Sequence, residues 1–139
     1  MSLYVLDTDI LTLLRLTDSR VCQQVAAHSP TELATTVITV EEQLRGWYTR
    51  LRRAKKRDEL ARAYQALADT AKALSGLAIL SFTESAIIRY EGLKSLKITI
   101  GKADLRIAAI TLENGSTLVT RNLRDFQQIP NLPLENWAV

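Results

Sequence analysis

The apolar positions of this chain form short runs that alternate with longer amphipathic stretches. The short runs, several of them rich in β-branched residues, predict strands at residues 3–6, 33–39, 77–82, 116–120 and, at a sheet edge, 132–136. The amphipathic stretches have helical period and predict helices at residues 10–16, 19–28, 40–54, 57–74, 83–96 and 102–115. Strands that alternate with helices predict an α/β protein whose mostly parallel sheet lies between two layers of helices.

Several residues mark the expected helix ends. Thr8 or Asp9 is expected to cap the first helix, and Thr83 caps the helix that follows residues 77–82. Asn114-Gly115 is a stop signal for the helix at residues 102–115. The two long helices at residues 40–54 and 57–74 predict a helical hairpin that turns near residues 55–58.

Length and composition fit an ordinary globular protein. The chain has 139 residues, of which 47% are hydrophobic and 24% charged, so we expect a single domain over residues 1–139. The lone cysteine, together with the lack of a signal peptide, predicts a cytoplasmic protein, and no apolar run is long enough to span a membrane. One histidine and one cysteine do not supply a zinc cluster.

Four carboxylates follow strands or open helices. They are Asp7, Glu42, Asp104 and Asp125. Parallel strands bring their carboxyl ends to one edge of a sheet, so we expect all four side chains to face one pocket. Each of them also has a structural interpretation, because acids favour the first turns of helices and aspartate favours turns. Their joint placement is what favours a site.

Clustered carboxylates repel one another unless a cation binds or some of them are protonated. Oxygen ligands without histidine or cysteine select Mg²⁺, or Mn²⁺, and Mg²⁺ takes only one or two direct carboxylates. We therefore expect Asp7 and Asp104 to be metal ligands, with Glu42 and Asp125 acting partly through water. This chemistry hydrolyses phosphodiester bonds.

The charge balance favours a polyanionic substrate. The chain has 18 Lys and Arg against 15 Asp and Glu, and setting the four site acids aside leaves 18 against 11, or +7. The densest basic run contains Arg50, Arg52, Arg53, Lys55 and Lys56. Two interpretations of this run remain open: contact with RNA phosphates, or a solvated hairpin end. Trp47 and Tyr48 beside it are expected to pack rather than to stack on bases.

Three motifs together resemble those of PIN-domain ribonucleases, specifically the VapC toxins of bacterial toxin–antitoxin pairs. They are "YVLDTDIL" with Asp7, "TVEEQLRG" with Gly46, and "IGKADLRIAAITLENGSTLVTRNLRDFQQIPNLPLENW". The resemblance selects Glu42 over Glu41 and adds Thr120 and Asn122 as supporting residues. Some relatives have an acid at the position of Asn122, so either that position or Asp125 fills the fourth site. The helical hairpin, which includes residues 48–75, is longer than in the shortest members of this family.

The resemblance implies a PIN-like three-layer α/β/α fold with a protruding helical hairpin. It also implies a Mg²⁺- or Mn²⁺-dependent endoribonuclease that forms a homodimer, acts on RNA and is inhibited by a cognate antitoxin protein. The alternative is a non-catalytic PIN-like or receiver-like module that binds a protein partner or nucleic acid. A receiver domain needs an aspartate at the end of residues 77–82, which this chain lacks. A glycosidase would use two carboxylates without metal, so EDTA would separate it from a metal-dependent nuclease.

Overall fold

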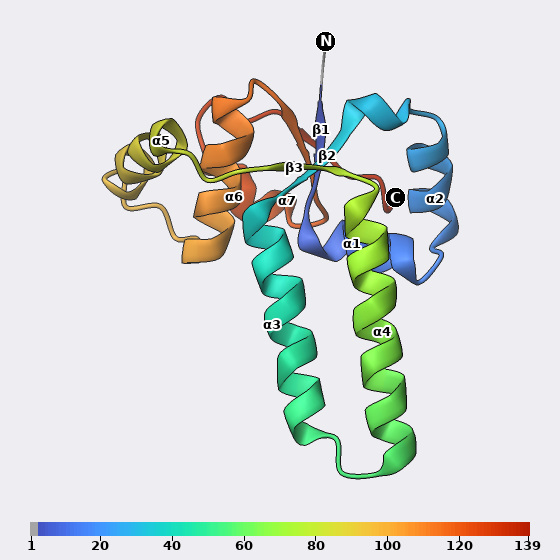
Figure 1. Ribbon diagram of the computed structural model, residues 1–139. Helices are drawn as coiled ribbons and strands as arrows, with labels where there is room; N and C mark the ends of the chain where they lie inside the picture. Colours follow the sequence, from blue (N-terminus) through green and yellow to red (C-terminus); the bar gives the residue numbers. More distant parts are fainter. Residues whose placement is uncertain (1–2) are drawn as a thin grey trace.

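Five short strands form one parallel sheet in the computed structural model, which describes residues 3–139 (Figure 1). The strand order is β3-β2-β1-β4-β5, and every neighbouring pair is parallel. The strands are β1 (Tyr4–Leu6), β2 (Leu33–Thr36), β3 (Ala78–Leu80), β4 (Thr117–Val119) and β5 (Leu134–Glu135). The predicted α/β class with a parallel sheet is therefore confirmed.

Seven α-helices and one 3₁₀ turn, η1 (Pro30–Glu32), connect these strands within residues 3–139. The helices are α1 (Thr8–Arg15), α2 (Ser19–Ala26), α3 (Val37–Arg53), α4 (Arg57–Ser75), α5 (Glu84–Lys94), α6 (Lys102–Glu113) and α7 (Leu123–Phe126). Each of β1, β2 and β4 runs almost directly into a helix, so the carboxyl ends of the strands and the starts of α1, α3 and α7 lie at one edge.

Two apolar cores cover the two faces of the sheet. Val5 and Leu118 point into a core built with α5, α6 and α7. Their neighbours Leu6 and Val119 point the other way, into a core closed by α1, α2 and Trp137. All four strand residues are fully buried. This alternation along β1 and β4 is what a central strand pair produces when both faces of the sheet are covered.

Helices α3 and α4 form the predicted hairpin, which extends away from the sheet (Figure 1). Trp47 of α3 is buried between the two helices, and its indole Nε1 donates a hydrogen bond of 2.8 Å to Thr70 Oγ1 of α4. Of the helices within residues 3–139, none combines the length and the apolar character needed to cross a membrane.

The structure corrects the predicted boundary between the strand at residues 33–39 and the next helix. Residues 37–39 are helical, because α3 begins at Val37 and Thr36 is its N-cap, whose side chain accepts from the amide of Thr39. The β-branched residues that predicted an extended strand form the first turn of a helix instead. Glu42 therefore lies in the second turn of α3, not in the first. Similarly, β3 ends at Leu80, and residues 81 and 82 are not part of it.

The predicted cap of α1 was also wrong. Asp7, rather than Thr8 or Asp9, is the N-cap of α1, and its Oδ1 accepts a hydrogen bond of 2.7 Å from the amide of Thr8. Asp9 is exposed in the first turn. The stop signal at Asn114-Gly115 is confirmed, since Asn114 is the C-cap of α6 and Gly115 has a φ of 59°, in the left-handed region that favours glycine.

Candidate active site

Asp7 lies at the centre of a hydrogen-bonded arrangement at the carboxyl edge of the sheet. It follows β1 directly, and only 7% of it is exposed. The amide of Thr8 donates to one of its carboxylate oxygens, and Thr120 Oγ1, just after β4, donates to the other at 2.8 Å. Both oxygens are therefore fixed in direction before any ligand binds. Burial raises the pKa of Asp7, and these two hydrogen bonds oppose that rise because they favour the charged form.

Two further carboxylates are oriented by neighbouring side chains. Thr8 Oγ1 donates to Glu42 Oε1 at 2.7 Å, which ties α1 to α3. Asn122 Nδ2 donates to Asp125 Oδ2 at 3.0 Å, and the amide of Asn122 donates to Thr120 Oγ1 at 3.0 Å. Hydrogen bonds thus run through Thr8, Thr120 and Asn122 and link three of the four predicted acids. The sequence motifs had indicated Thr120 and Asn122 but not Thr8.

Asp104 completes the set, and its environment differs from that of the other three. It lies in the first turn of α6, as predicted, and among residues 3–139 no donor reaches its carboxylate. Burial, followed by the negative charges of Asp7, Glu42 and Asp125, raises the pKa of Asp104 to about 6. These three acids are therefore close enough to repel the Asp104 carboxylate. An acid with like-charged neighbours and no donor is suited to receive a cation.

The donor set fits a hard cation, although the carboxylates do not form a closed cage. Within residues 3–139, no group of three or more His, Cys, Asp or Glu side chains is arranged to hold a metal ion. Mg²⁺ does not need such a group, because it commonly keeps several water molecules and binds only one or two carboxylates directly. The oxygen chemistry of Asp7 and Asp104 is compatible with this mode of binding.

The raised pKa of Asp104 predicts how metal-free stability depends on pH. Folding disfavours the charged carboxylate, so the penalty is absent below the ordinary pKa of 3.8 and complete above about 6. As pH rises through this window in EDTA, wild type should lose about 1–2 kcal/mol of unfolding free energy relative to Asp104→Asn, after allowance for partial exposure. Urea unfolding of both proteins at a series of pH values measures the difference. A difference that is constant with pH would contradict this account of Asp104.

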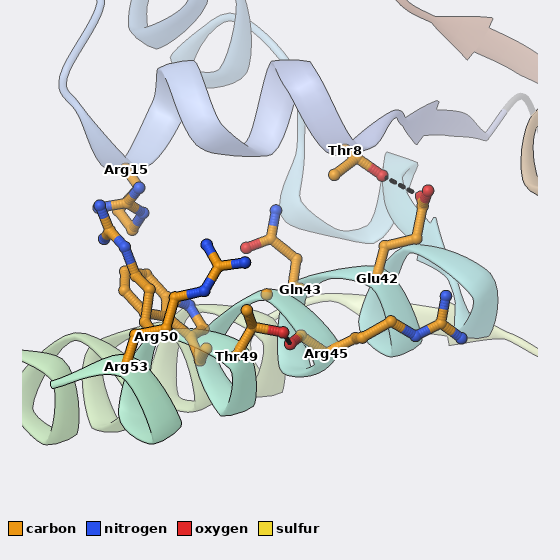
Figure 2. A pocket seen from close by; sticks show the side chains of 10 residues that line it. Thr8, Arg15, Glu42, Gln43, Arg45, Thr49, Arg50 and Arg53 are labelled. Carbon is orange, nitrogen blue, oxygen red and sulfur yellow. Dashed lines mark hydrogen bonds between the residues drawn. The ribbon is translucent and has the colours of Figure 1, made fainter.

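A groove of about 650 Å³ leads away from the Thr8–Glu42 hydrogen bond along α3. Figure 2 shows this hydrogen bond at one end of the groove and Arg15, Arg50 and Arg53 at the other. The polar side chains that line it come from α1 and α3: Thr8, Arg15, Glu42, Gln43, Arg45, Thr49, Arg50 and Arg53. The sequence patterns had not indicated Arg15, because nothing local distinguishes it from any exposed helical arginine.

The predicted basic run divides into two groups. All five side chains are exposed, but only Arg50 and Arg53 line the groove, whereas Arg52, Lys55 and Lys56 do not. The two neighbouring aromatic residues divide as well. Trp47 is buried, which confirms its packing role. Tyr48 is 52% exposed, so the expectation that it also packs was wrong. Consecutive residues of a helix point about 100° apart, which places one ring inside the hairpin and the other outside.

Comparison with known proteins relates the chain to one group. No family model matches it. Ribonuclease VapC2 of Rickettsia felis is 40% identical to it over 68 residues, which are 46% of this chain and 51% of that protein. The match thus spans about half the length of this curated relative.

Solved structures extend the similarity to the whole fold. The chain is similar to the DNA-bound VapBC of Salmonella typhimurium with a TM-score of 0.81 and 22% identity, over 99% of both chains. It is also similar to a toxin–antitoxin complex of Klebsiella pneumoniae, with a TM-score of 0.73 and 25% identity over 96% of this chain and 97% of that one. The resemblance that the motifs had indicated is confirmed by this agreement of sequence and fold.

Proposed function

We propose that this chain, which is related to the VapC-type PIN-domain toxins, hydrolyses RNA as a metal-dependent endoribonuclease. The observation that carries the proposal is Asp104. Its carboxylate has no hydrogen-bond donor within residues 3–139. Burial raises its pKa, and so do the negative charges of Asp7, Glu42, Asp125 and Asp9. An arrangement of this kind costs folding energy unless a cation compensates it, and such a cost is typical of functional sites.

In the proposed site, Asp7 and Asp104 would hold the cation, Mg²⁺ or Mn²⁺. When bound, such an ion polarises a phosphoryl oxygen and lowers the pKa of a coordinated water. Thr120 and the amide of Thr8 keep both Asp7 oxygens in a fixed direction, so that binding requires little rearrangement. The chain's own contribution is therefore preorganisation of the ligands.

Glu42 and Asp125 act in the same site through water molecules. Thr8 occupies only Oε1 of Glu42, which leaves Oε2 to hold a water and to accept its proton during in-line attack on the phosphorus. Asn122 occupies Oδ2 of Asp125, which leaves Oδ1 for a second water. Of the two candidates for the fourth position, we propose Asp125 as the acid and Asn122 as the residue that orients it.

The first test is the metal dependence of RNA cleavage. The purified protein, incubated with total cellular RNA, should produce new ends in Mg²⁺ or Mn²⁺ and none in EDTA, with activity restored when the metal is added back. An Asp7→Asn protein purified in parallel is the control, because a contaminating ribonuclease would survive in that preparation. Cleavage that continues undiminished in EDTA would exclude the mechanism.

We also propose that the protein is the toxin of a toxin–antitoxin pair, inhibited by a cognate antitoxin, and that it forms a homodimer. Support comes from the similar Klebsiella pneumoniae protein, which was solved as a toxin–antitoxin complex. A second candidate function is a non-catalytic PIN-like module that binds nucleic acid or a protein. The arginine side chains that line the groove along α3 favour this alternative, because they can bind a polyanion without any catalysis. Absence of cleavage in both metals, together with retained RNA binding, would select it.

A further inference from the structure

Three arginines meet at the end of the groove that lies away from the carboxylates. They are Arg15 of α1 and Arg50 and Arg53 of α3, called here the arginine cluster (Figure 2). Within the part of the chain that the structure describes, none of the three forms an ion pair. Arg45, which also lines the groove, differs because it pairs with Glu41 at 2.9 Å. The arginine cluster therefore concentrates positive charge that the chain itself does not neutralise.

The buried ring of Trp47 holds two members of the arginine cluster in place. The guanidinium carbons of Arg15 and Arg50 lie 5.5 Å and 5.0 Å from the centroid of the Trp47 ring, which is within the range of cation–π attraction. The ring itself is immobilised, because it is 6% exposed and its Nε1 is hydrogen-bonded to Thr70 of α4. Two arginines from different helices are thus held over one ring despite their mutual repulsion.

A second hollow, of about 560 Å³, continues the groove between α3 and α4. All three members of the arginine cluster line both hollows. The second hollow also contains Glu59 and Arg62, and Arg62 pairs with Asp58 at 3.2 Å. The arginine cluster therefore lies at the junction of two open hollows, where an extended ligand can pass over it.

We propose that the arginine cluster is a phosphate-binding subsite for the RNA strand that occupies the proposed active site, an inference that rests on the proposed function. Glu42 and Arg50 lie eight positions apart on α3, which at the helical rise is a distance of about 12 Å along the groove. A nucleic acid strand carries one charge on every nucleotide, so a strand whose scissile phosphate is at Glu42 presents a further phosphate at the arginine cluster. Planar guanidinium groups bind phosphate oxygens in pairs.

The same geometry indicates that this subsite contacts the phosphates of the strand and not its bases. The Trp47 ring is buried and covered by guanidinium groups, so no base can stack on it. Phosphate contacts carry no sequence information. The arginine cluster should therefore bind strands of any sequence, and it should raise the affinity for a long strand over a short one that ends at the scissile bond. An acidic protein segment carries similar charges. The proposed function favours the RNA strand, because a strand that is cleaved at the Glu42 end must also extend along the groove to the arginine cluster.

Binding measured without turnover tests the proposal. A fluorescent single-stranded oligouridylate is titrated with the protein in EDTA at several salt concentrations, using wild type, Arg15→Gln, Arg50→Gln and Arg53→Gln. Each of these variants should bind about tenfold more weakly, as the loss of one charge-assisted contact implies. Each should also flatten the log–log dependence on salt by about 0.7. Arg52→Gln is the matched control, because Arg52 is exposed on the same helix but lines neither hollow.

The outcomes separate this proposal from the proposed function. Weaker binding in the three variants but not in Arg52→Gln supports the subsite, even when Mg²⁺ brings no cleavage and the ribonuclease proposal fails. Equal losses in Arg52→Gln and Arg50→Gln would overturn the subsite in favour of diffuse attraction by the whole hairpin. Unchanged RNA affinity in Arg15→Gln and Arg50→Gln, with weaker binding of a polyglutamate peptide, would assign the groove to an acidic protein segment and also overturn it.

Discussion

Replacing Asp104 by asparagine is expected to reduce RNA cleavage by more than about a hundredfold, since changes even to groups around metal ligands cause losses of that size. The same substitution should leave the metal-free protein as stable as wild type or more stable. The asparagine side chain retains the shape of the aspartate but lacks the negative charge that Asp7, Glu42 and Asp125 repel. Initial rates of RNA cleavage and thermal melts in EDTA measure the two effects.

Added metal should distinguish the two proteins further. A ligand that binds only the folded state stabilises it according to its affinity, so Mg²⁺ should raise the melting temperature of wild type more than that of Asp104→Asn. Asp18→Ala is the matched control: Asp18 is a structural carboxylate that accepts from two amides at the start of α2, each at 3.1 Å. Its loss should cost about 1 kcal/mol and leave the response to metal intact. An Asp104→Asn protein that melts lower in EDTA yet gains as much from Mg²⁺ as wild type would show that Asp104 is not a ligand.

The second large effect concerns the helical hairpin. Trp47→Ala should lower the free energy of unfolding by about 3–5 kcal/mol, the usual cost of truncating a buried aromatic side chain. The ring is 6% exposed between α3 and α4, and its removal also leaves the buried hydroxyl of Thr70 without its donor. Since typical domains are stable by only about 5–15 kcal/mol, the loss should be evident in urea unfolding at equilibrium.

Two further variants separate the contribution of the Trp47 hydrogen bond from that of its packing, and the buried ring from its exposed neighbour. Trp47→Phe retains most of the packing but loses the indole N–H, and should cost about 1–3 kcal/mol because a buried acceptor is left unpaired. Tyr48→Ala removes the exposed neighbouring ring and should change stability by less than about 0.5 kcal/mol. A Trp47→Ala protein as stable as Tyr48→Ala would mean that Trp47 does not hold the hairpin together.

The parts of the fold that the sequence predicted correctly depend on interactions close along the chain. Helical period located α5 and α6, and Asn114-Gly115 marked the end of α6, because caps and amphipathic faces are set within a few residues. The first turn of α6 carries Asp104 as expected. The error at residues 37–39 is also local in origin: β-branched residues favour strands, but the side chain of Thr36 caps a helix there, and the cap prevails.

The parts that the sequence did not predict depend on neighbours far along the chain. Arg15 belongs to the groove only because α1 lies beside α3, and no spacing within α1 indicates this. Thr8 likewise contributes to the site through a hydrogen bond to Glu42, 34 positions away. A sequence pattern shows which face of a helix is apolar, but not which other helix that face will meet.

The hydrogen bond from Thr120 to Asp7 joins residues 113 positions apart and depends on the pairing of β1 with β4. A ribosome delivers the chain from its N-terminus, so β1, α1 and α3 emerge long before β4. During that interval Asp7 lacks one of its two donors, and Asp104 and Asp125 are not yet present. Closing so long a loop is also among the slower steps of folding. The hydrogen-bonded arrangement around Asp7 is therefore incomplete in a nascent chain, and it forms only after β4 and α7 have left the ribosome.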